Sequence, residues 1–138
     1  MYAFLYPESV FEFGGELIGE LKGGWHSPGL VIPLYQYVVP KNRVLHLQYV
    51  HITAKPLGTT GDLVVIWELW SPNNVRIVRL AEISVPYNIS PPSQIRTIPV
   101  NIIVPADYKL SLIYASSLNQ NAWVEWSFTG ILYEIFRV

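Results

Sequence analysis

The sequence predicts an all-β protein built as an antiparallel β-sandwich, and three observations support this prediction. Stretches rich in Val, Ile, Tyr, Trp and Phe recur along the chain, and each is bounded by Pro, Gly, Asn or Ser. These turn residues return at intervals of about eight to twelve residues, which is typical of sandwiches and barrels. No stretch of about 12 residues or more repeats apolar side chains at the spacing of an amphipathic helix.

The stretch 36–55, QYVVPKNRVLHLQYVHITAK, contains a proline-marked turn and then a long strand whose apolar alternation changes phase. The first phase comprises Leu45, Leu47 and Tyr49, and the second comprises Val50, Ile52 and Ala54. Because strand side chains alternate between two faces, a phase change within one strand predicts a bulge or a crossing between sheets. Long bent strands of this kind are typical of sandwiches and jelly rolls, so we expect a jelly roll.

Residues 1–28 differ from the rest of the chain. Short apolar bursts alternate there with Pro7 and two glycine pairs, and the glycines argue against a helix. Two interpretations stay open: the first edge strands of the sandwich, or an extended N-terminal arm that reaches across a neighbouring subunit. The arm interpretation assigns oligomer or shell contacts to four aromatic residues, namely Phe4, Tyr6, Phe11 and Phe13.

Residues 29–138 are expected to form the sandwich domain. The expected strands are 30–38, 43–55, 62–70, 75–85, 94–104, 107–115 and 122–136. The sequence SPNN at 71–74 separates two strong strands and predicts a hairpin. Pro33 and Pro99 fall inside expected strands, and because proline lacks the backbone donor they predict sheet edges or bulges.

The composition is poor in charge. Charged residues make up 14% of the chain, well below the ~25% of ordinary soluble domains, while 51% of its residues are hydrophobic. We therefore expect another protein surface to cover part of the apolar exterior, with a well-packed monomer as the alternative. The nine scattered Lys and Arg argue against a nucleic-acid partner. The lack of cysteine excludes disulfides and thiolate sites.

The sequence shows neither a membrane helix nor an export signal. Its apolar runs are far shorter than the ~20 residues that span a bilayer as a helix. The start, MYAFLYPES, lacks the basic and apolar regions of a cleaved signal peptide, so we expect none.

The histidines predict no metal site. His46 and His51 lie five residues apart in one expected strand, and His26 lies in a glycine- and proline-rich loop. Neither spacing matches a known set of metal ligands, so no metal or other cofactor is expected.

Two strand carboxylates beside tryptophan, Glu68 and Glu125, are the only candidates for an acid–base pair such as jelly-roll glycoside hydrolases use. The favoured interpretation is that both face solvent or pair with an arginine, because alternation places a lone charge on the wet face. The candidate arginines are Arg76, Arg79 and Arg96. We therefore expect a protein that is not an enzyme.

The aromatic residues allow two interpretations. Large aromatics contribute much of the packing in cores and subunit interfaces, and Trp67 and Trp123 are expected in the core. Trp25 and Trp70 lie next to turns and are the candidates for an exposed platform that stacks on sugar rings.

Two short motifs resemble small jelly-roll structural proteins of virus particles, the capsid decoration and fibre-head type of tailed phages and archaeal viruses. The motifs are V-P-x-N-R-x-L-x-L at 39–47 and SFTGILYE at 127–134. The resemblance implies a structural role in symmetric assembly, usually as a trimer.

The predicted function is therefore that of a virion structural protein, most simply a capsid decoration or stabilising protein. Its expected partners are copies of itself, with a trimer favoured, and other capsid or virion proteins. Its expected location is the virion, assembled in the host cytoplasm. The alternative is a carbohydrate-binding module or a receptor-binding fibre or spike head, for which the partner is a glycan.

Overall fold

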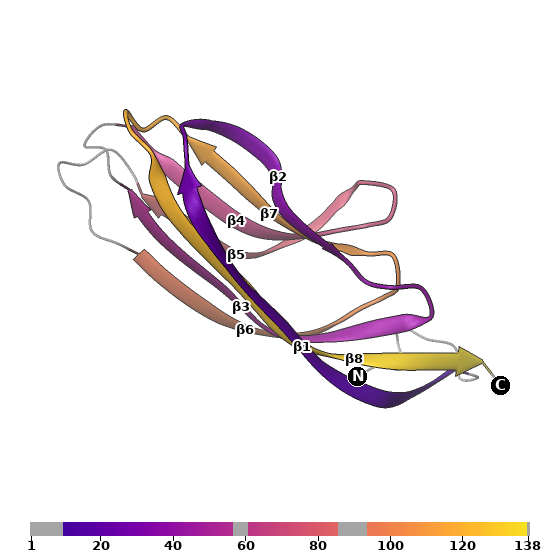
Figure 1. Ribbon diagram of the computed structural model, residues 1–138. Coiled ribbons are helices and arrows are strands. Elements are labelled where there is room, and N and C mark those ends of the chain that lie inside the picture. Colours follow the sequence, from indigo (N-terminus) through magenta and orange to yellow (C-terminus); the bar gives the residue numbers. More distant parts are fainter. Residues whose placement is uncertain (1–9, 57–60, 86–93, 138) are drawn as a thin grey trace.

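The computed structural model describes residues 10–56, 61–85 and 94–137, with side chains described at 22–56, 61–84 and 94–134. Every regular element in these ranges is a β-strand, so none of them is a helix long enough to cross a membrane. The strands form two sheets stacked face to face, as Figure 1 shows. The first sheet has the order β1-β8-β3-β6 and the second has the order β2-β7-β4-β5.

The strand bounds follow the predicted ones closely. The strands are β1 (Val10–His26), β2 (Gly29–Val38), β3 (Arg43–Pro56), β4 (Leu63–Trp70), β5 (Arg76–Val85), β6 (Gln94–Val104), β7 (Lys109–Ser116) and β8 (Ala122–Arg137). Each bound between β2 and β8 lies within two residues of the sequence-based expectation. The predicted all-β sandwich is confirmed.

The connections give a jelly-roll-like topology. Successive strands cross from one sheet to the other at every connection except that between β4 and β5, which are neighbours in the second sheet. All strand pairs are antiparallel. This arrangement of eight strands as two interleaved halves is that of a jelly roll.

Residues 10–26 belong to the first sheet, where β1 pairs along its whole length with β8. Residues 1–9 lie outside the described residues. An arm at the start of the chain, and the boundary at residue 28, therefore stay predictions.

The predicted bulge in β3 is confirmed against β8, where Gln48 is the extra residue between the pairs Leu47–Gly130 and Tyr49–Thr129. Against β6 the extra residue lies on β6, because Gln48 alone stands opposite Val100 and Asn101. Leu47 and Val50 consequently both point into the core, and both are fully buried. Tyr49 was grouped in one phase with Leu45 and Leu47, but it does not share their buried face: it is 48% exposed, because the bulge comes before it and not after it.

Gly130 in β8 lies directly opposite the bulge, paired with Leu47. A Cβ atom at Gly130 would lie 2.7 Å from the His46 carbonyl oxygen and 2.8 Å from Leu45 Cδ1. The bulge brings the two backbones too close for any side chain, so the glycine of the SFTGILYE motif has a packing reason.

The two prolines lie in edge strands, as predicted. Pro33 follows a cis peptide bond in β2, where the register shifts between Val31 and Tyr35. Pro99 lies in β6, opposite Tyr49. The predicted hairpin is also present at 71–74, where the Asn74 amide donates to the Ser71 carbonyl oxygen at 3.1 Å.

The core lies between the sheets and contains a layer of aromatic rings. Its members are Tyr35, Tyr37, Trp67 and Tyr114 from the second sheet and Trp126 and Phe128 from the first. The rings meet across the sandwich: Trp67 and Phe128 have centroids 6.2 Å apart, and Tyr37 and Phe128 have centroids 4.9 Å apart. Trp67, predicted as a core residue, is fully buried.

Trp67 also makes a hydrogen bond between the sheets. Its indole Nε1 donates to the backbone carbonyl oxygen of His51 in β3 at 3.0 Å. The second buried tryptophan of this layer, Trp126, differs, because its Nε1 is buried and has no hydrogen-bond partner among the described residues. Buried donors without a partner are costly, so the two indoles contribute differently to stability.

We expect Trp67→Phe to lower the free energy of unfolding by about 1–3 kcal/mol more than Trp126→Phe does. Both substitutions remove a similar volume, but only the first removes a buried hydrogen bond. Urea unfolding followed by circular dichroism measures the difference. Equal losses for the two variants would contradict a stabilising role of the bond to His51.

Candidate functional site

The four aromatic residues assigned to oligomer contacts cannot be placed as side chains. Phe4 and Tyr6 lie outside the described residues. Phe11 and Phe13 belong to β1, with their backbones paired to Phe136 and Glu134, and their side chains lie outside the described ones. Their assignment stays a prediction.

The two tryptophans proposed as a glycan platform do not lie together. Trp25 is 50% exposed on the outer face of the first sheet, and Trp70 is partly covered on the outer face of the second. Trp25 instead meets Trp123 of β8 edge to face, with ring centroids 5.3 Å apart. Trp123 was expected in the core; it is only partly buried, because it faces outward between the core residues Ala122 and Val124.

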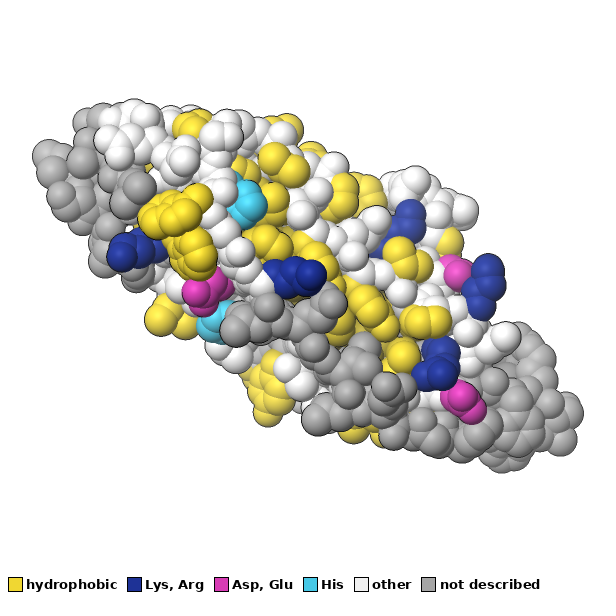
Figure 2. All heavy atoms as spheres, in the orientation of Figure 1, with side chains coloured by type: hydrophobic (Ala, Val, Ile, Leu, Met, Phe, Trp, Pro, Cys, Tyr) yellow, Lys and Arg dark blue, Asp and Glu magenta, His cyan; other side chains and the backbone are white. Residues whose placement is uncertain are grey.

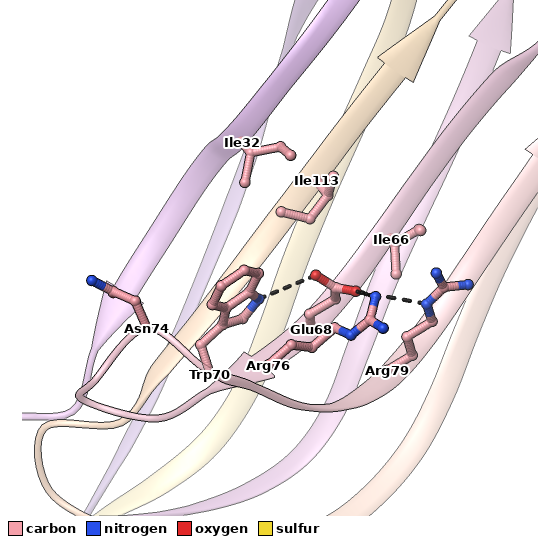
Figure 3. A pocket seen from close by; sticks show the side chains of 8 residues that line it. All are labelled: Ile32, Ile66, Glu68, Trp70, Asn74, Arg76, Arg79 and Ile113. Atoms are coloured by element: carbon pink, nitrogen blue, oxygen red, sulfur yellow. Dashed lines mark hydrogen bonds and ion pairs between the residues drawn. The ribbon is translucent and has the colours of Figure 1, made fainter.

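The outer face of the second sheet carries a pocket of about 490 Å³. Figure 3 shows the side chains around it, which come from β2, β4, β5, β7 and the hairpin between β4 and β5. The lining residues are Ile32, Ile66, Glu68, Trp70, Asn74, Arg76, Arg79 and Ile113. This volume is within the range of ~300–1,000 Å³ that is usual for small-molecule sites.

Glu68 lies at the bottom of this pocket and is only 3% exposed. Arg76 donates Nη1 to its Oε2 at 3.2 Å, and Arg79 Nε lies 3.6 Å from the same oxygen. Trp70 donates its indole Nε1 to the other oxygen, Oε1, at 3.1 Å. The predicted pairing of Glu68 with Arg76 and Arg79 is confirmed.

The prediction that Glu68 faces solvent was only half right. Its side chain points away from the core, as strand alternation requires, because its neighbours Trp67 and Leu69 both point into the core. It is nevertheless buried, because the side chains of Arg76 and Arg79 from β5 and of Trp70 contact its carboxylate. Alternation along one strand carries no information about these neighbours.

Cross-strand register orders the outer face into rows. One row holds Lys109, Trp70 and Arg76, and the next holds Ser111, Glu68 and Arg79. The third row holds Ile113, Ile66 and Glu82, of which the two isoleucines line the pocket, and Ile32 lies beside Ile113 in Figure 3. The pocket therefore has a polar end at the β4–β5 hairpin and an apolar end of three isoleucines.

The charges at the polar end do not cancel. Arg79 is held by two carboxylates, since its Nη1 also donates to Glu82 Oε1 at 2.9 Å. Lys109 Nζ donates to the Asn74 side-chain oxygen. Arg76, Arg79 and Lys109 against Glu68 and Glu82 leave one positive charge, and the Arg76 side chain is 52% exposed.

The two carboxylates considered as an acid–base pair are separated by the sandwich. Glu68 faces outward from the second sheet, whereas Glu125 faces outward from the first, beside Trp123, whose Nε1 donates to Glu125 Oε1 at 3.0 Å. Stacked sheets alone lie about 10 Å apart, beyond the spacing that glycoside hydrolysis uses. Both oxygens of Glu68 are also occupied by donors, so the pocket does not present a free catalytic base.

Sequence reasoning missed the pocket, although a signal for its centre exists. In both Glu68-Leu69-Trp70 and Trp123-Val124-Glu125 a glutamate and a tryptophan stand two residues apart on a strand. Such residues share one face of the sheet. In both cases the indole donates to the carboxylate.

The histidines form no metal site within the described ranges. His51 on the outer face of the first sheet contacts two hydroxyl groups, with its Nδ1 2.7 Å from Thr97 Oγ1 and its Nε2 2.8 Å from Thr53 Oγ1. His26 is different, because it ends β1 and packs against the rings of Tyr114 and Trp126 at 5.6 and 5.9 Å. Burial lowers the pKa of His26 below its ordinary value of 6.5.

Many of the exposed large hydrophobic side chains lie on the two edges of the second sheet, while Trp25, Tyr49 and Ile95 are exposed on the first. On β2 they are Leu30 at 67%, Ile32 at 56% and Val38 at 46% exposed, and beside β4 they are Val75, Ile77 and Val78 at 58%, 52% and 45% exposed. Figure 2 shows hydrophobic side chains across much of the visible face, with few charged groups between them. This pattern fits the low charged fraction of the chain.

No family model and no curated protein matches the sequence. Among solved structures, a chain of infectious bursal disease virus, Gx strain, is similar with a TM-score of 0.45 and 12% identity over 92% of this chain and 37% of that chain. A Nora virus chain gives a TM-score of 0.44 and 14% identity over 90% of this chain and 61% of that chain. A CBM4 structure gives a TM-score of 0.32 and 12% identity over 91% of this chain and 94% of that chain.

This chain thus spans less than two thirds of each of these viral chains. Because the TM-scores are below 0.5, its function has to be argued from its own residues.

The lowered pKa of His26 predicts a pH dependence of stability. The unfolded chain, with the ordinary histidine pKa, binds more protons than the folded chain as pH falls below about 6.5, so the free energy of unfolding decreases there. We expect His26→Phe to reduce this decrease between about pH 7 and pH 5, measured by urea unfolding at each pH. Parallel pH curves for the variant and the parent would show that His26 is not its source.

Proposed function

We propose that the chain is a virion structural protein that assembles with copies of itself, most simply as a capsid decoration or stabilising protein. The observation that carries this proposal is the pair of apolar edges on the second sheet. Monomeric proteins seldom leave so many large aliphatic side chains half exposed side by side.

The two edges are different surfaces, and this favours a ring. The β2 edge presents Leu30, Ile32 and Val38, and the β5 edge presents Val75, Ile77 and Val78. When one surface of a subunit meets a different surface of the next, the contact repeats and forms a ring if the rotation closes, or an open filament if it does not. We propose that the β2 edge meets the β5 edge of a neighbour in a closed ring, with a trimer as the favoured size and a standard interface of about 800 Å² on each side.

Both edge strands carry features that prevent open-ended strand pairing. The cis bond before Pro33 and the register shift interrupt β2, and Arg76, Arg79 and Glu82 place charges along β5. Such features block backbone pairing between sheets while leaving side-chain contacts available. The proposed interface is therefore a side-chain interface and not a continuous sheet.

The two virion-like motifs support the same proposal. The stretch 39–47 leads into β3, the stretch 127–134 lies in β8, and the two pair in the centre of the first sheet. The bulge leaves no room for a side chain at Gly130, so both motifs belong to the packed region around the bulge. An N-terminal arm with contacts through Phe4, Tyr6, Phe11 and Phe13 remains part of the proposal.

We expect a mass of three times the 15.7 kDa chain by light scattering at micromolar concentration. Leu30→Lys and Ile77→Lys should each shift the mass to that of the monomer, because each interface of the ring joins the β2 edge of one subunit to the β5 edge of the next. Tyr49→Lys, at a side chain 48% exposed on the first sheet, is the control and should leave the mass unchanged.

The outcomes separate the alternatives. A monomer mass for the parent at all concentrations would refute self-assembly. A two-fold dimer through β2 alone would respond to Leu30→Lys and not to Ile77→Lys, and would refute the ring.

A second candidate function is glycan recognition, as in a receptor-binding head, and the Trp25–Trp123 pair favours it. The two rings present exposed aromatic surface beside the Glu125 carboxylate, and Lys55 lies opposite Trp123 in the next strand. Gly23 leaves room for these groups, since a Cβ there would lie 2.9 Å from Glu125 Cγ. Aromatic faces with adjacent polar groups suit pyranose rings.

This candidate predicts that a soluble oligosaccharide from a glycan array quenches tryptophan fluorescence. Trp25→Ala should abolish the quenching, whereas Trp70→Ala on the other sheet should retain it. An array without any bound glycan, or quenching that survives Trp25→Ala, would exclude the Trp25–Trp123 surface as a sugar site.

A further inference from the structure

We propose that the pocket around Glu68 binds an organic carboxylate with an apolar tail, held by Arg76 at the polar end and by isoleucines at the other. This inference does not depend on the proposed assembly. It rests on the geometry of the outer face of the second sheet.

The polar end is built to hold a guanidinium group in place. Arg76 is anchored through Nη1 to the buried Glu68, and its side chain remains half exposed. An arginine has five N–H donors, and Glu68 is the partner of Arg76 among the described residues, so donors remain for a second carboxylate. Pairing of a guanidinium with a carboxylate is short, strong and often two-pronged.

The other cations of the site complete the charge balance. Arg76 and Arg79 balance the charge of Glu68, Trp70 donates a hydrogen bond to it, and Glu82 pairs with Arg79. The single positive charge left over lies at the Arg76 and Lys109 end, on either side of the Trp70 indole. A ligand with one negative charge is therefore complementary to the pocket.

The apolar end defines the remainder of the ligand. Ile66 and Ile113 are largely buried beside the pocket, and Ile32 lies beside Ile113 in Figure 3. From the row of Trp70 to that of Ile66 the strand advances by four residues, about 13 Å at the rise of a β-strand. An extended medium-length aliphatic tail fits within this length, and aliphatic walls favour an aliphatic tail over a sugar ring.

The choice of a carboxylate over a neutral ligand follows from Arg76, and the choice of a tail over a bare anion follows from the isoleucines. Free medium-chain fatty acids and the carboxylate of an apolar peptide terminus share this chemistry. Octanoate is the probe for the first source, and an acetylated peptide ending in Ile-Leu with a free carboxylate is the probe for the second.

The test follows the indole N–H signal of Trp70 in ¹H–¹⁵N correlation spectra, assigned with Trp70→Phe. We expect octanoate to shift this signal in a saturable way, with acetate and 1-octanol each binding at least about tenfold more weakly, since each lacks one of the two contacts. Arg76→Gln should weaken octanoate binding at least about tenfold, and Arg76→Lys should weaken it less. Arg96→Gln, at an exposed arginine of β6 on the other sheet, is the matched control and should bind as the parent does.

Three results would overturn the proposal. The first is equal binding of octanoate and 1-octanol, the second is equal binding by the Arg76→Gln and Arg96→Gln variants, and the third is shifts spread over all indole signals. A peptide that binds while octanoate does not would keep the carboxylate site and assign its source to a protein terminus. Light scattering on the same samples reports assembly separately, so failure of one proposal is distinguishable from failure of the other.

Discussion

The indole of Trp67 joins the two sheets of the sandwich. The strands within each sheet are paired by backbone hydrogen bonds, so side chains between the sheets contribute much to how the sheets stack. Trp67 contributes in two ways, because its ring packs against Phe128 of the opposite sheet and its N–H donates to the His51 carbonyl in that same sheet. Burial alone is non-directional, and the hydrogen bond adds a fixed position. The bulge at Gln48 turns Val50 and Ile52 inward on the strand segment that carries His51.

The sequence predicted most of this framework because the residues that favour a strand lie within the strand itself and in the turns beside it. Alternation, β-branched residues and turn residues placed β2 to β8 within two residues of their bounds, and the phase change in β3 predicted its bulge. It placed the bulge one position too late, because Tyr49 is apolar enough to count as a core residue. For residues 10–26 the sequence left two interpretations open, edge strands or an arm, since the pairing of β1 with β8 spans more than 90 residues of sequence and leaves no local mark.

The candidate site could be predicted only in part, for a related reason. Alternation correctly turned Glu68 away from the core, and charge correctly paired it with Arg76 and Arg79. Its burial depends on which residues of β5 and β7 stand opposite it, and register between strands is set by the whole sheet. The same holds for Trp25 and Trp70. As single exposed tryptophans they looked equivalent, yet the fold gives Trp25 an aromatic neighbour and Trp70 a carboxylate.

The pocket and the proposed interface share one residue, and this has a thermodynamic consequence. Ile32 lines the pocket and also belongs to the exposed β2 edge. If a neighbouring subunit packs on that edge, it also changes the solvation of the pocket wall, and a ligand tail in the pocket changes what the neighbour contacts. Coupling between two binding events is reciprocal, so assembly and carboxylate binding must favour or oppose each other by the same factor. Arg76 lies on β5, next to the apolar residues of the opposite edge, so in a ring the polar end of the pocket also approaches an interface. In the proposed assembly, neighbouring subunits therefore approach the pocket from its β2 side and from its β5 side.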